Sequence, residues 1–220
     1  MIINHFSDSH GGNLNVDRKC DIVVHSGDFL PDPPFLSSKE NAAHWQANWL
    51  DNKAKEYKLY INNKPFIFCS GNHDYLNGEQ VEEILRKNNI NATCINDKIF
   101  DFNGLKFYGF PWIKYINGYF NYELSDNGMN IKCNELKEAF SNSYINVLVA
   151  HGPMTNGLCV EGTKDYGNKV LEDTLLSLNK EYVPDTMLVG HIHLSKGIKF
   201  RYDLNMLIVN SATTNHIIEI

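Results

Sequence analysis

Short apolar segments recur along the chain, and each of them is followed by a cluster of polar residues. The segments are rich in β-branched residues and have the length of a buried strand. We therefore expect strands at residues 2–6, 21–25, 65–69, 145–150 and 186–189.

Other segments place apolar residues at the spacing of a helix. Residues 39–57 carry Ala42, Trp45, Trp49 and Leu50 at this spacing, which predicts an amphipathic helix whose tryptophans belong to the core. Shorter helices are expected at residues 79–87, 131–140 and 168–179.

Two hairpins are also expected. Alternating segments flank Asn103-Gly104 within residues 98–109, and this dipeptide is the preferred pair for a type I′ turn. The aromatic-rich segment 110–122 that follows is expected to be mostly irregular. A second hairpin is expected at residues 199–210, and a final strand at residues 216–220.

The order of these elements mixes β-α-β units with hairpins. Such an order predicts an α/β protein in which two mixed sheets pack together and helices cover their outer faces. Because no repeat, low-complexity tract or linker divides the chain, we expect a single domain over residues 1–220.

The charge of the chain argues against a protein that binds nucleic acid stably. The net charge is -6, and the lysines and arginines are dispersed along the sequence. Proteins that bind the DNA or RNA backbone usually have a basic face. We therefore expect a small or metal-held substrate.

The remaining composition favours a cytoplasmic protein without membrane association. No apolar segment is long enough to span a bilayer, and the first residues lack the basic and apolar regions of a secretory signal. The five cysteines are scattered without a CxxC pair, which indicates reduced, mostly buried thiols.

The polar clusters after the five strands contain aspartate, asparagine or histidine. In open α/β sheets ligands bind outside the carboxyl ends of the strands, so all five clusters are expected on one rim. In an extended chain, residues i and i+2 point to the same side. This spacing would allow Asp8 and His10 to face one metal ion, and His191 and His193 to do the same.

Glycines add to this pattern. A glycine allows the backbone to turn sharply and to approach an ion closely. Such a residue precedes Asp28, Asn72 and His191. A single histidine or Gly-Asp pair at a strand end is usually structural, but the whole series in this order favours a metal site.

The other histidines and the aromatic segment give weaker signals. His5, His44 and His216 are expected to be structural, whereas His25 is a candidate for supporting a metal ligand. Trp112 could either pack in the core or stack on a nucleobase.

The series of motifs resembles the signature of the calcineurin-like metallophosphoesterases. It consists of Asp8-x-His10, Gly27-Asp28, Gly71-Asn72-His73-Asp74, His151 and Gly190-His191-x-His193. The segments DIVVHSGDF, FYGFPW, HGP and GHIH are also similar to the MPPED-type branch, whose members hydrolyse cyclic nucleotides and other phosphodiesters. The resemblance implies a four-layer α-β-β-α sandwich of two mixed sheets, the metallophosphoesterase fold.

Carried over to these positions, the resemblance implies two metal sites. One ion would be held by Asp8, His10 and His193, the other by Asn72, His151 and His191, and Asp28 would bridge them. The catalytic His73 would lie beside the ions and, with Asn72, contact the substrate phosphate. Asp74 would orient His73.

The expected donors are imidazole nitrogens and carboxylate or amide oxygens, without a thiolate. This set suits Mn²⁺, Fe, Ni²⁺ or Zn²⁺ rather than a structural zinc, and we expect two divalent ions, with Mn²⁺ first among them. Two ions about 3.5–4 Å apart lower the pKa of a bridging water and stabilise the attacking and leaving oxygens. The bridging hydroxide would attack phosphorus, and His73 would protonate the leaving group.

We therefore expect a metal-dependent phosphodiesterase that hydrolyses a small nucleotide substrate, such as a cyclic nucleotide, with Trp112 contacting the base. Three alternatives remain. A phosphomonoesterase or protein phosphatase is disfavoured because no arginine lies next to the motifs. A nuclease is disfavoured by the acidic charge, and a non-catalytic scaffold of the same fold by the complete set of expected ligands.

Overall fold

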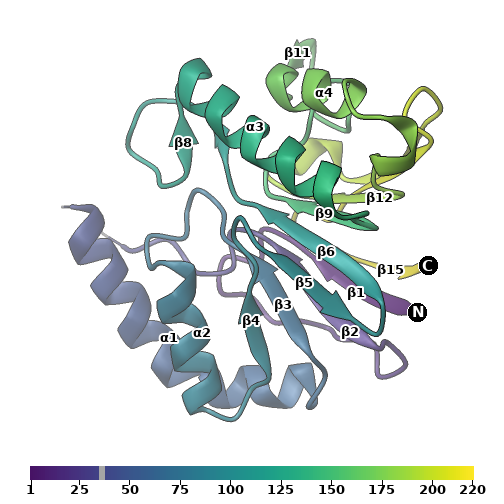
Figure 1. Ribbon diagram of the computed structural model, residues 1–220. Helices are drawn as coiled ribbons and strands as arrows, with labels where there is room; N and C mark the ends of the chain where they lie inside the picture. The colour runs from purple at the N-terminus through teal and green to yellow at the C-terminus, as the bar shows by residue number, and fades with distance from the viewer. Residues whose placement is uncertain (35–37) are drawn as a thin grey trace.

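The computed structural model describes residues 1–34 and 38–220 and contains two large β-sheets. The first sheet is built from β1 (Ile2–Phe6), β2 (Ile22–Ser26), β3 (Phe66–Cys69), β4 (Ala92–Cys94) and β15 (Asn215–Glu219). Its strand order is β15-β1-β2-β3-β4, with β1 to β4 parallel and β15 antiparallel to β1. The two chain ends therefore lie side by side (Figure 1).

The second sheet has six strands. They are β5 (Ile99–Phe102), β6 (Leu105–Phe110), β9 (Val147–Ala150), β12 (Thr186–Val189), β13 (Gly197–Arg201) and β14 (Met206–Asn210). In the order β13-β14-β12-β9-β6-β5, the four inner strands are parallel and the two edge strands are antiparallel to their neighbours. Both large sheets are therefore mixed.

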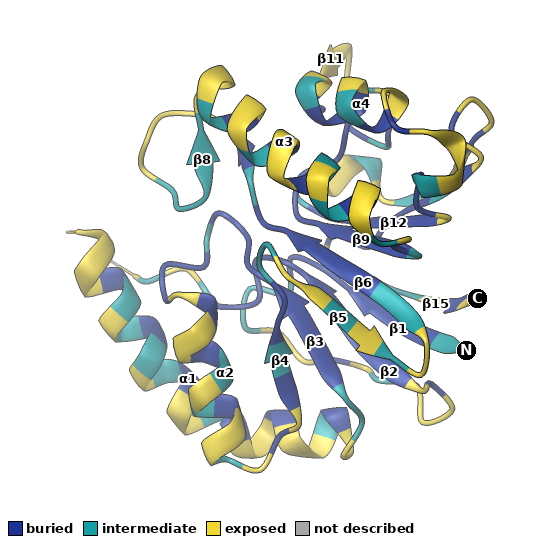
Figure 2. Ribbon diagram, viewed as in Figure 1, coloured by how far each residue is buried: buried dark blue, intermediate teal, exposed yellow. Residues whose placement is uncertain are grey.

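Helices cover the outer faces of both sheets. They are α1 (Lys39–Ile61), α2 (Gly78–Lys87), α3 (Asp126–Asn142) and α4 (Lys169–Leu176). Each begins after a serine or asparagine whose side chain accepts a hydrogen bond from a backbone N–H of the first turn, a cap that stabilises the helix start. Figure 2 shows that the helices are exposed on the side that faces away from the sheets.

Short elements complete the chain. Two small two-stranded sheets pair β7 (Ile113–Lys114) with β8 (Glu123–Leu124) and β10 (Val160–Glu161) with β11 (Lys164–Asp165). Two 3-10 turns lie at Lys180–Tyr182 and His193–Ser195. None of the helices is long and apolar enough to cross a membrane, as far as the described part of the chain shows.

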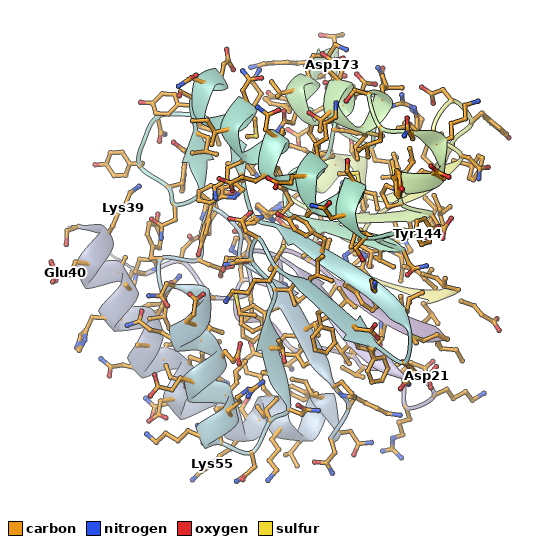
Figure 3. The ribbon with its side chains drawn as sticks, in the orientation of Figure 1. Asp21, Lys39, Glu40, Lys55, Tyr144 and Asp173 are labelled. Atoms are coloured by element: carbon orange, nitrogen blue, oxygen red, sulfur yellow. The ribbon has the colours of Figure 1, made fainter. Side chains whose placement is uncertain are left out.

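Three apolar cores separate four layers. Ile3, Val24 and Ile67 of the first sheet pack against the second sheet in the central core. A second core joins the first sheet to α1 and α2, and a third joins the second sheet to α3 and α4. This arrangement confirms the expected four-layer α-β-β-α sandwich, and side chains fill the space between its layers (Figure 3).

Most elements lie where the sequence predicts them. The hairpin turn is confirmed, because Asn103 and Gly104 both have positive φ and Phe102 pairs with Leu105. The expected irregular segment contains the small strand β7, and α3 begins earlier than predicted, at Asp126.

The tryptophans of α1, Trp45 and Trp49, were predicted to lie in the core; Trp49 packs against it, but neither tryptophan is fully buried. The buried face of α1 is formed instead by smaller or polar-tipped side chains, including Ala42, Gln46 and Leu50. The five cysteines are free and buried, as expected.

Candidate metal centre

The polar clusters of the two sheets meet at one rim, as the sequence predicts. Asp8, Asp28 and Asn72 follow the neighbouring strands β1, β2 and β3 of the first sheet. His151 and His191 follow the neighbouring strands β9 and β12 of the second sheet. Because the inner strands of each sheet are parallel, their carboxyl ends bring all these side chains to the same edge.

The backbone at these positions is not extended, so the argument from i and i+2 spacing is wrong. Asp8, His10, Asp28 and His191 have φ values of 52°, 42°, 55° and 65°, in the left-handed region. Such conformations are costly for residues with a side chain and are found where surrounding contacts enforce them. Here the N–H groups of Asp8 and His10 donate to the carbonyls of Gly27 and Asp28 at 2.9 and 3.0 Å.

Two glycines make this close arrangement possible. A Cβ on Gly190 would overlap with the Ser7 hydroxyl and the Asp8 carboxylate. Gly27 has a φ of 106°, which side chains disfavour. The glycines before His191 and Asp28 therefore have the two roles that the sequence predicts, close approach at the first and a sharp turn at the second.

The first candidate metal cluster contains Asp8, His10 and His193, whose donor atoms all lie within 4.8 Å of one another. The Nε2 atom of His193 lies 3.1 Å from Oδ1 of Asp8. The same buried carboxylate accepts a hydrogen bond from the backbone N–H of His191 at 2.9 Å. Asp8 thus connects the first sheet to the loop after β12 of the second.

The second candidate cluster contains Asp28, His151 and His191. Nε2 of His151 lies 2.9 Å from Oδ1 of Asn72 and 3.3 Å from Oδ2 of Asp28. The other ring nitrogen of His151 donates to the carbonyl of Ser26 at 3.0 Å, so its orientation is fixed with Nε2 facing the cluster. The same Asp28 oxygen lies 3.9 Å from Nε2 of His10, which places Asp28 between the two clusters.

The charges of the cluster fit a cation. Burial alone would raise the pKa of Asp28, but the His151 imidazole more than offsets this and holds that pKa well below its usual range. Burial lowers the pKa of His191 to about 4, so this imidazole is neutral. Burial disfavours the charged form of His151 too, yet Asp28 raises its pKa to about 9. The carboxylates of Asp8 and Asp28 are therefore negatively charged although they are buried, and imidazoles surround them.

The donor set is suited to divalent metal ions. Within residues 1–34 and 38–220, the ion-pair partners of Asp8 and Asp28 are all histidines. The buried Nδ1 atom of His10 has no hydrogen-bond partner among these residues and lies 3.9 Å from Oδ2 of Asp32, which forms a third group of possible donors with His10 and His73. Carboxylate, amide and imidazole donors without a thiolate fit Mn²⁺, Fe, Ni²⁺ or Zn²⁺.

His73 lies at the edge of the clusters and is held by a residue that the sequence analysis missed. Its Nδ1 atom contacts Oδ1 of Asp32 at 2.5 Å, and its ring meets that of His10 edge-on with centroids 5.1 Å apart. Burial lowers the pKa of His73, but the hydrogen bond with Asp32 raises it overall. Its position in the sequence could have identified Asp32 as a candidate, because it lies in the same loop as Asp28, four residues later.

The expectation that Asp74 orients the His73 ring is wrong. The buried Asp74 carboxylate accepts backbone N–H groups of Leu30 and Gly71 at 2.8 Å each. It therefore ties the loop after β3 to the loop after β2. Asp74 supports the backbone that carries His73, whereas Asp32 contacts the ring.

The remaining histidines support the loops. His5 lies between the hydroxyls of Ser26 and Ser211, at 2.9 and 2.7 Å, and His216 contacts the same Ser211. His44 is exposed on α1. His25 contacts Ser9, between Asp8 and His10, at 2.9 Å, consistent with its expected support of a metal loop.

Trp112 contacts neighbouring side chains and also lines a cavity. Its indole N–H donates to the carboxylate of Asp97 at 2.9 Å, and the ammonium of Lys132 lies 5.0 Å from its ring centre. The residue nevertheless lines a cavity of about 340 Å³ that His191 also lines. Its contact with a nucleobase stays a prediction.

Comparison with known proteins identifies the fold and the family. The sequence profile of the calcineurin-like phosphoesterases matches residues 1–195. No curated protein matches the chain. Of the solved structures, one has a TM-score of 0.68 at 12% identity, covering 96% of this chain and 90% of its own.

Two further solved structures have the same fold. The protein TT1561 of Thermus thermophilus has a TM-score of 0.60 at 12% identity, covering 96% of this chain and 88% of its own. A Staphylococcus aureus protein provisionally assigned as a 5′-nucleotidase, in complex with α-ketoglutarate, has a TM-score of 0.56 at 16% identity, and the match covers 95% of this chain but 48% of that one. These likenesses show the fold, and the sequence match adds the family. The chain belongs to the calcineurin-like phosphoesterase family.

Proposed function

We propose that this protein is a phosphodiesterase that depends on two divalent metal ions and hydrolyses small nucleotide substrates. The observation that carries the proposal is the convergence of carboxylate, amide and imidazole donors from five strand ends at one rim. When bound, the ions would supply positive charge for the phosphate and an activated water.

The two clusters divide the donors between the ions. Asp8, His10 and His193 would hold one ion, and Asn72, His151 and His191 the other. Asp28 would contact both, and its Oδ1 accepts the backbone N–H of His73 at 2.8 Å, which fixes the carboxylate. Mn²⁺ is the ion we expect first.

His73 is suited to act on the substrate. With Nδ1 held by Asp32, its Nε2 atom is the one left to donate a proton to the leaving oxygen or a hydrogen bond to the phosphoryl group. Phe120 covers the ring from one side, with centroids 4.6 Å apart. Asp32 and Phe120 thus restrict the orientations open to the imidazole.

Two cavities favour a diester over a monoester. The cavity beside His191 has a volume of about 340 Å³. A second one, of about 530 Å³, is lined by Asp8 and His10 together with uncharged polar residues such as Asn13 and Thr213. A linear phosphodiester could place one of its two organic groups in each cavity, whereas a monoester or a cyclic nucleotide, which has a single nucleoside, needs only one.

A nucleotide substrate is supported by the aromatic lining of the first cavity, which includes Trp112, Tyr115 and Tyr166. A base stacked on such a ring gains about 1–3 kcal/mol. A protein of related fold carries a provisional 5′-nucleotidase assignment, which is consistent with this class of substrate. The MPPED-like segments favour cyclic nucleotides within it.

Replacing Trp112 tests recognition of the base. Trp112→Ala should raise KM for a cyclic nucleotide about 10- to 100-fold, since a stacking surface is lost, and should leave hydrolysis of bis-p-nitrophenyl phosphate nearly unchanged. Trp112→Phe is the control that keeps a ring but loses the bond to Asp97. Equal losses for both substrates in the alanine variant would show that Trp112 only packs.

Replacing Asp32 tests the support of His73. Asp32→Asn should lower kcat about 10- to 100-fold, the range found when a residue that orients a histidine of the site is replaced. Metal content is measured in parallel, because Asp32 also lies 3.9 Å from Nδ1 of His10. The double variant Asp32→Asn/His73→Ala should have nearly the same kcat as His73→Ala, because both changes remove the action of the same imidazole. Asp74→Asn should instead lower the unfolding temperature. Additive losses in the double variant would contradict the pairing.

A substrate screen tests the proposed function itself. We expect Mn²⁺-loaded protein to hydrolyse bis-p-nitrophenyl phosphate and at least one cyclic nucleotide, and chelation to abolish both activities. Activity confined to mono-p-nitrophenyl phosphate would identify a phosphomonoesterase. Cleavage of long single- or double-stranded DNA would identify a nuclease, and no metal-dependent activity a scaffold.

A further inference from the structure

The cavity beside His191 carries positive charge. It lies between the loop that contains β7 and the hairpin of β10 and β11, and two lysines from these separate elements line it, Lys114 and Lys164. In the structure as described, neither lysine forms an ion pair. Two unpaired cations beside a proposed phosphate site are unexpected in a chain of net charge -6.

The one carboxylate among the residues that line the cavity is already engaged. Asp165 also lines the cavity, but its Oδ1 atom accepts the backbone N–H of Gly167 at 2.7 Å and contacts the Cys159 thiol at 3.0 Å. These contacts hold the carboxylate within its own loop. Among the residues that line the cavity, two lysine charges therefore exceed the charge of one carboxylate.

An aromatic surface accompanies the charge. The ammonium of Lys164 lies 4.5 Å from the ring centre of Tyr166, and both residues are exposed. Tyr115 and Trp112 lie in the opposite loop and also line the cavity. A ligand that combines a flat ring with an anionic group matches such a lining, because ring stacking and lysine contacts act on different parts of it.

We propose that this cavity binds a nucleoside arm that carries a second phosphate, in addition to the phosphodiester group that is hydrolysed. Lys114 and Lys164 select that phosphate, and the aromatic residues contact the base. The inference rests on the proposed phosphodiesterase function and narrows its substrate class. The single charge of a simple diester needs no such cations, whereas a second phosphate on the nucleoside does.

A matched pair of substrates tests the inference. The p-nitrophenyl ester of thymidine 5′-phosphate and its 3′-phosphorylated analogue differ only in the second phosphate. We expect Mn²⁺-loaded wild-type protein to prefer the 3′-phosphorylated ester. The double variant Lys114→Gln/Lys164→Gln should reduce this preference about tenfold, the effect of losing charge-assisted hydrogen bonds at a partly exposed site.

Two controls isolate the cavity. Lys55→Gln removes an exposed lysine of α1, labelled in Figure 3, that does not line the cavity, and it should leave the preference unchanged. Hydrolysis of bis-p-nitrophenyl phosphate, which has no second phosphate, should be equal in all variants. Equal loss on both thymidine esters, or no loss on either, would overturn the inference.

Calorimetry separates this inference from the proposed function. Thymidine 3′,5′-bisphosphate should bind the Mn²⁺-loaded double variant about tenfold more weakly than it binds wild type, and thymidine 5′-monophosphate should bind both equally. If wild type hydrolyses none of the esters, the proposed function is wrong. The affinity for the bisphosphate then tests by itself whether the two lysines bind a second phosphate. Equal affinity of the bisphosphate for both proteins would then reject the lysine site.

Discussion

Asp28→Ala is expected to lose both metal ions and, with them, all metal-dependent hydrolysis. Asp28 lies between the two clusters, and its Oδ2 atom is 3.3 Å from His151 and 3.9 Å from His10. One carboxylate would therefore serve both ions, so its removal takes a negative donor from each site at once. Metal analysis of purified protein after gel filtration measures the loss.

A variant at one cluster is the matched control. His193→Ala removes a donor from the Asp8 cluster alone and should lower the occupancy of that site while the other keeps its ion. The folded state of each variant is checked by circular dichroism. Near-normal occupancy of both sites in Asp28→Ala would contradict the assignment of Asp28 as the shared ligand.

His73→Ala is expected to keep its metal ions and to lose about 10²–10⁴-fold in rate, the usual contribution of a general acid. The imidazole lies beside the clusters and belongs to neither proposed ligand set. Only the backbone N–H of residue 73 contacts Asp28, and that bond survives the substitution. Steady-state kinetics together with metal analysis test both parts.

The leaving group separates two roles of His73. A p-nitrophenolate leaves without a proton, whereas an alkoxide needs one, so the loss should be larger for an alkyl ester than for a p-nitrophenyl ester. Asp32→Asn should show the same dependence in weaker form. Equal losses for both leaving groups would exclude proton donation and leave a hydrogen bond to the phosphate as the role of His73.

The fold could be predicted because its determinants are local. Apolar segments such as residues 186–189 mark buried strands, and Asn103-Gly104 marks a turn that only a few residue pairs favour. Parallel strands bring Asp8 and Asp28 to one edge of the first sheet. His151 follows a parallel strand of the second sheet, and the packing of the two sheets brings it 3.3 Å from Asp28.

The conformations at the rim could not be predicted from spacing. Asp8, His10 and His191 are in left-handed conformations held by hydrogen bonds to distant loops, as in the N–H of His191 that donates to Asp8. Sequence alone does not show such long-range bonds. The side chains of Asp8 and His10 do lie together, as expected, but not because the chain is extended there.

The sequence also did not show which side chains contact one another. Asp74 is next to His73 in sequence whereas Asp32 is 41 residues away, and only the structure shows that Asp32 contacts the ring. Similarly, Lys114 and Lys164 lie fifty residues apart in sequence and line one cavity. In the sequence, only arginines next to the motifs were considered as cations for a phosphate, so these two lysines were missed.

The most direct test of the metal centre is anomalous scattering from crystals of the Mn²⁺-loaded protein. Data collected on both sides of the manganese edge should show two peaks about 3.5–4 Å apart, the usual separation in two-metal sites. One peak should lie among Asp8, His10 and His193 and the other among Asn72, His151 and His191, with Asp28 between them. A single peak, or peaks away from these donors, would contradict the account.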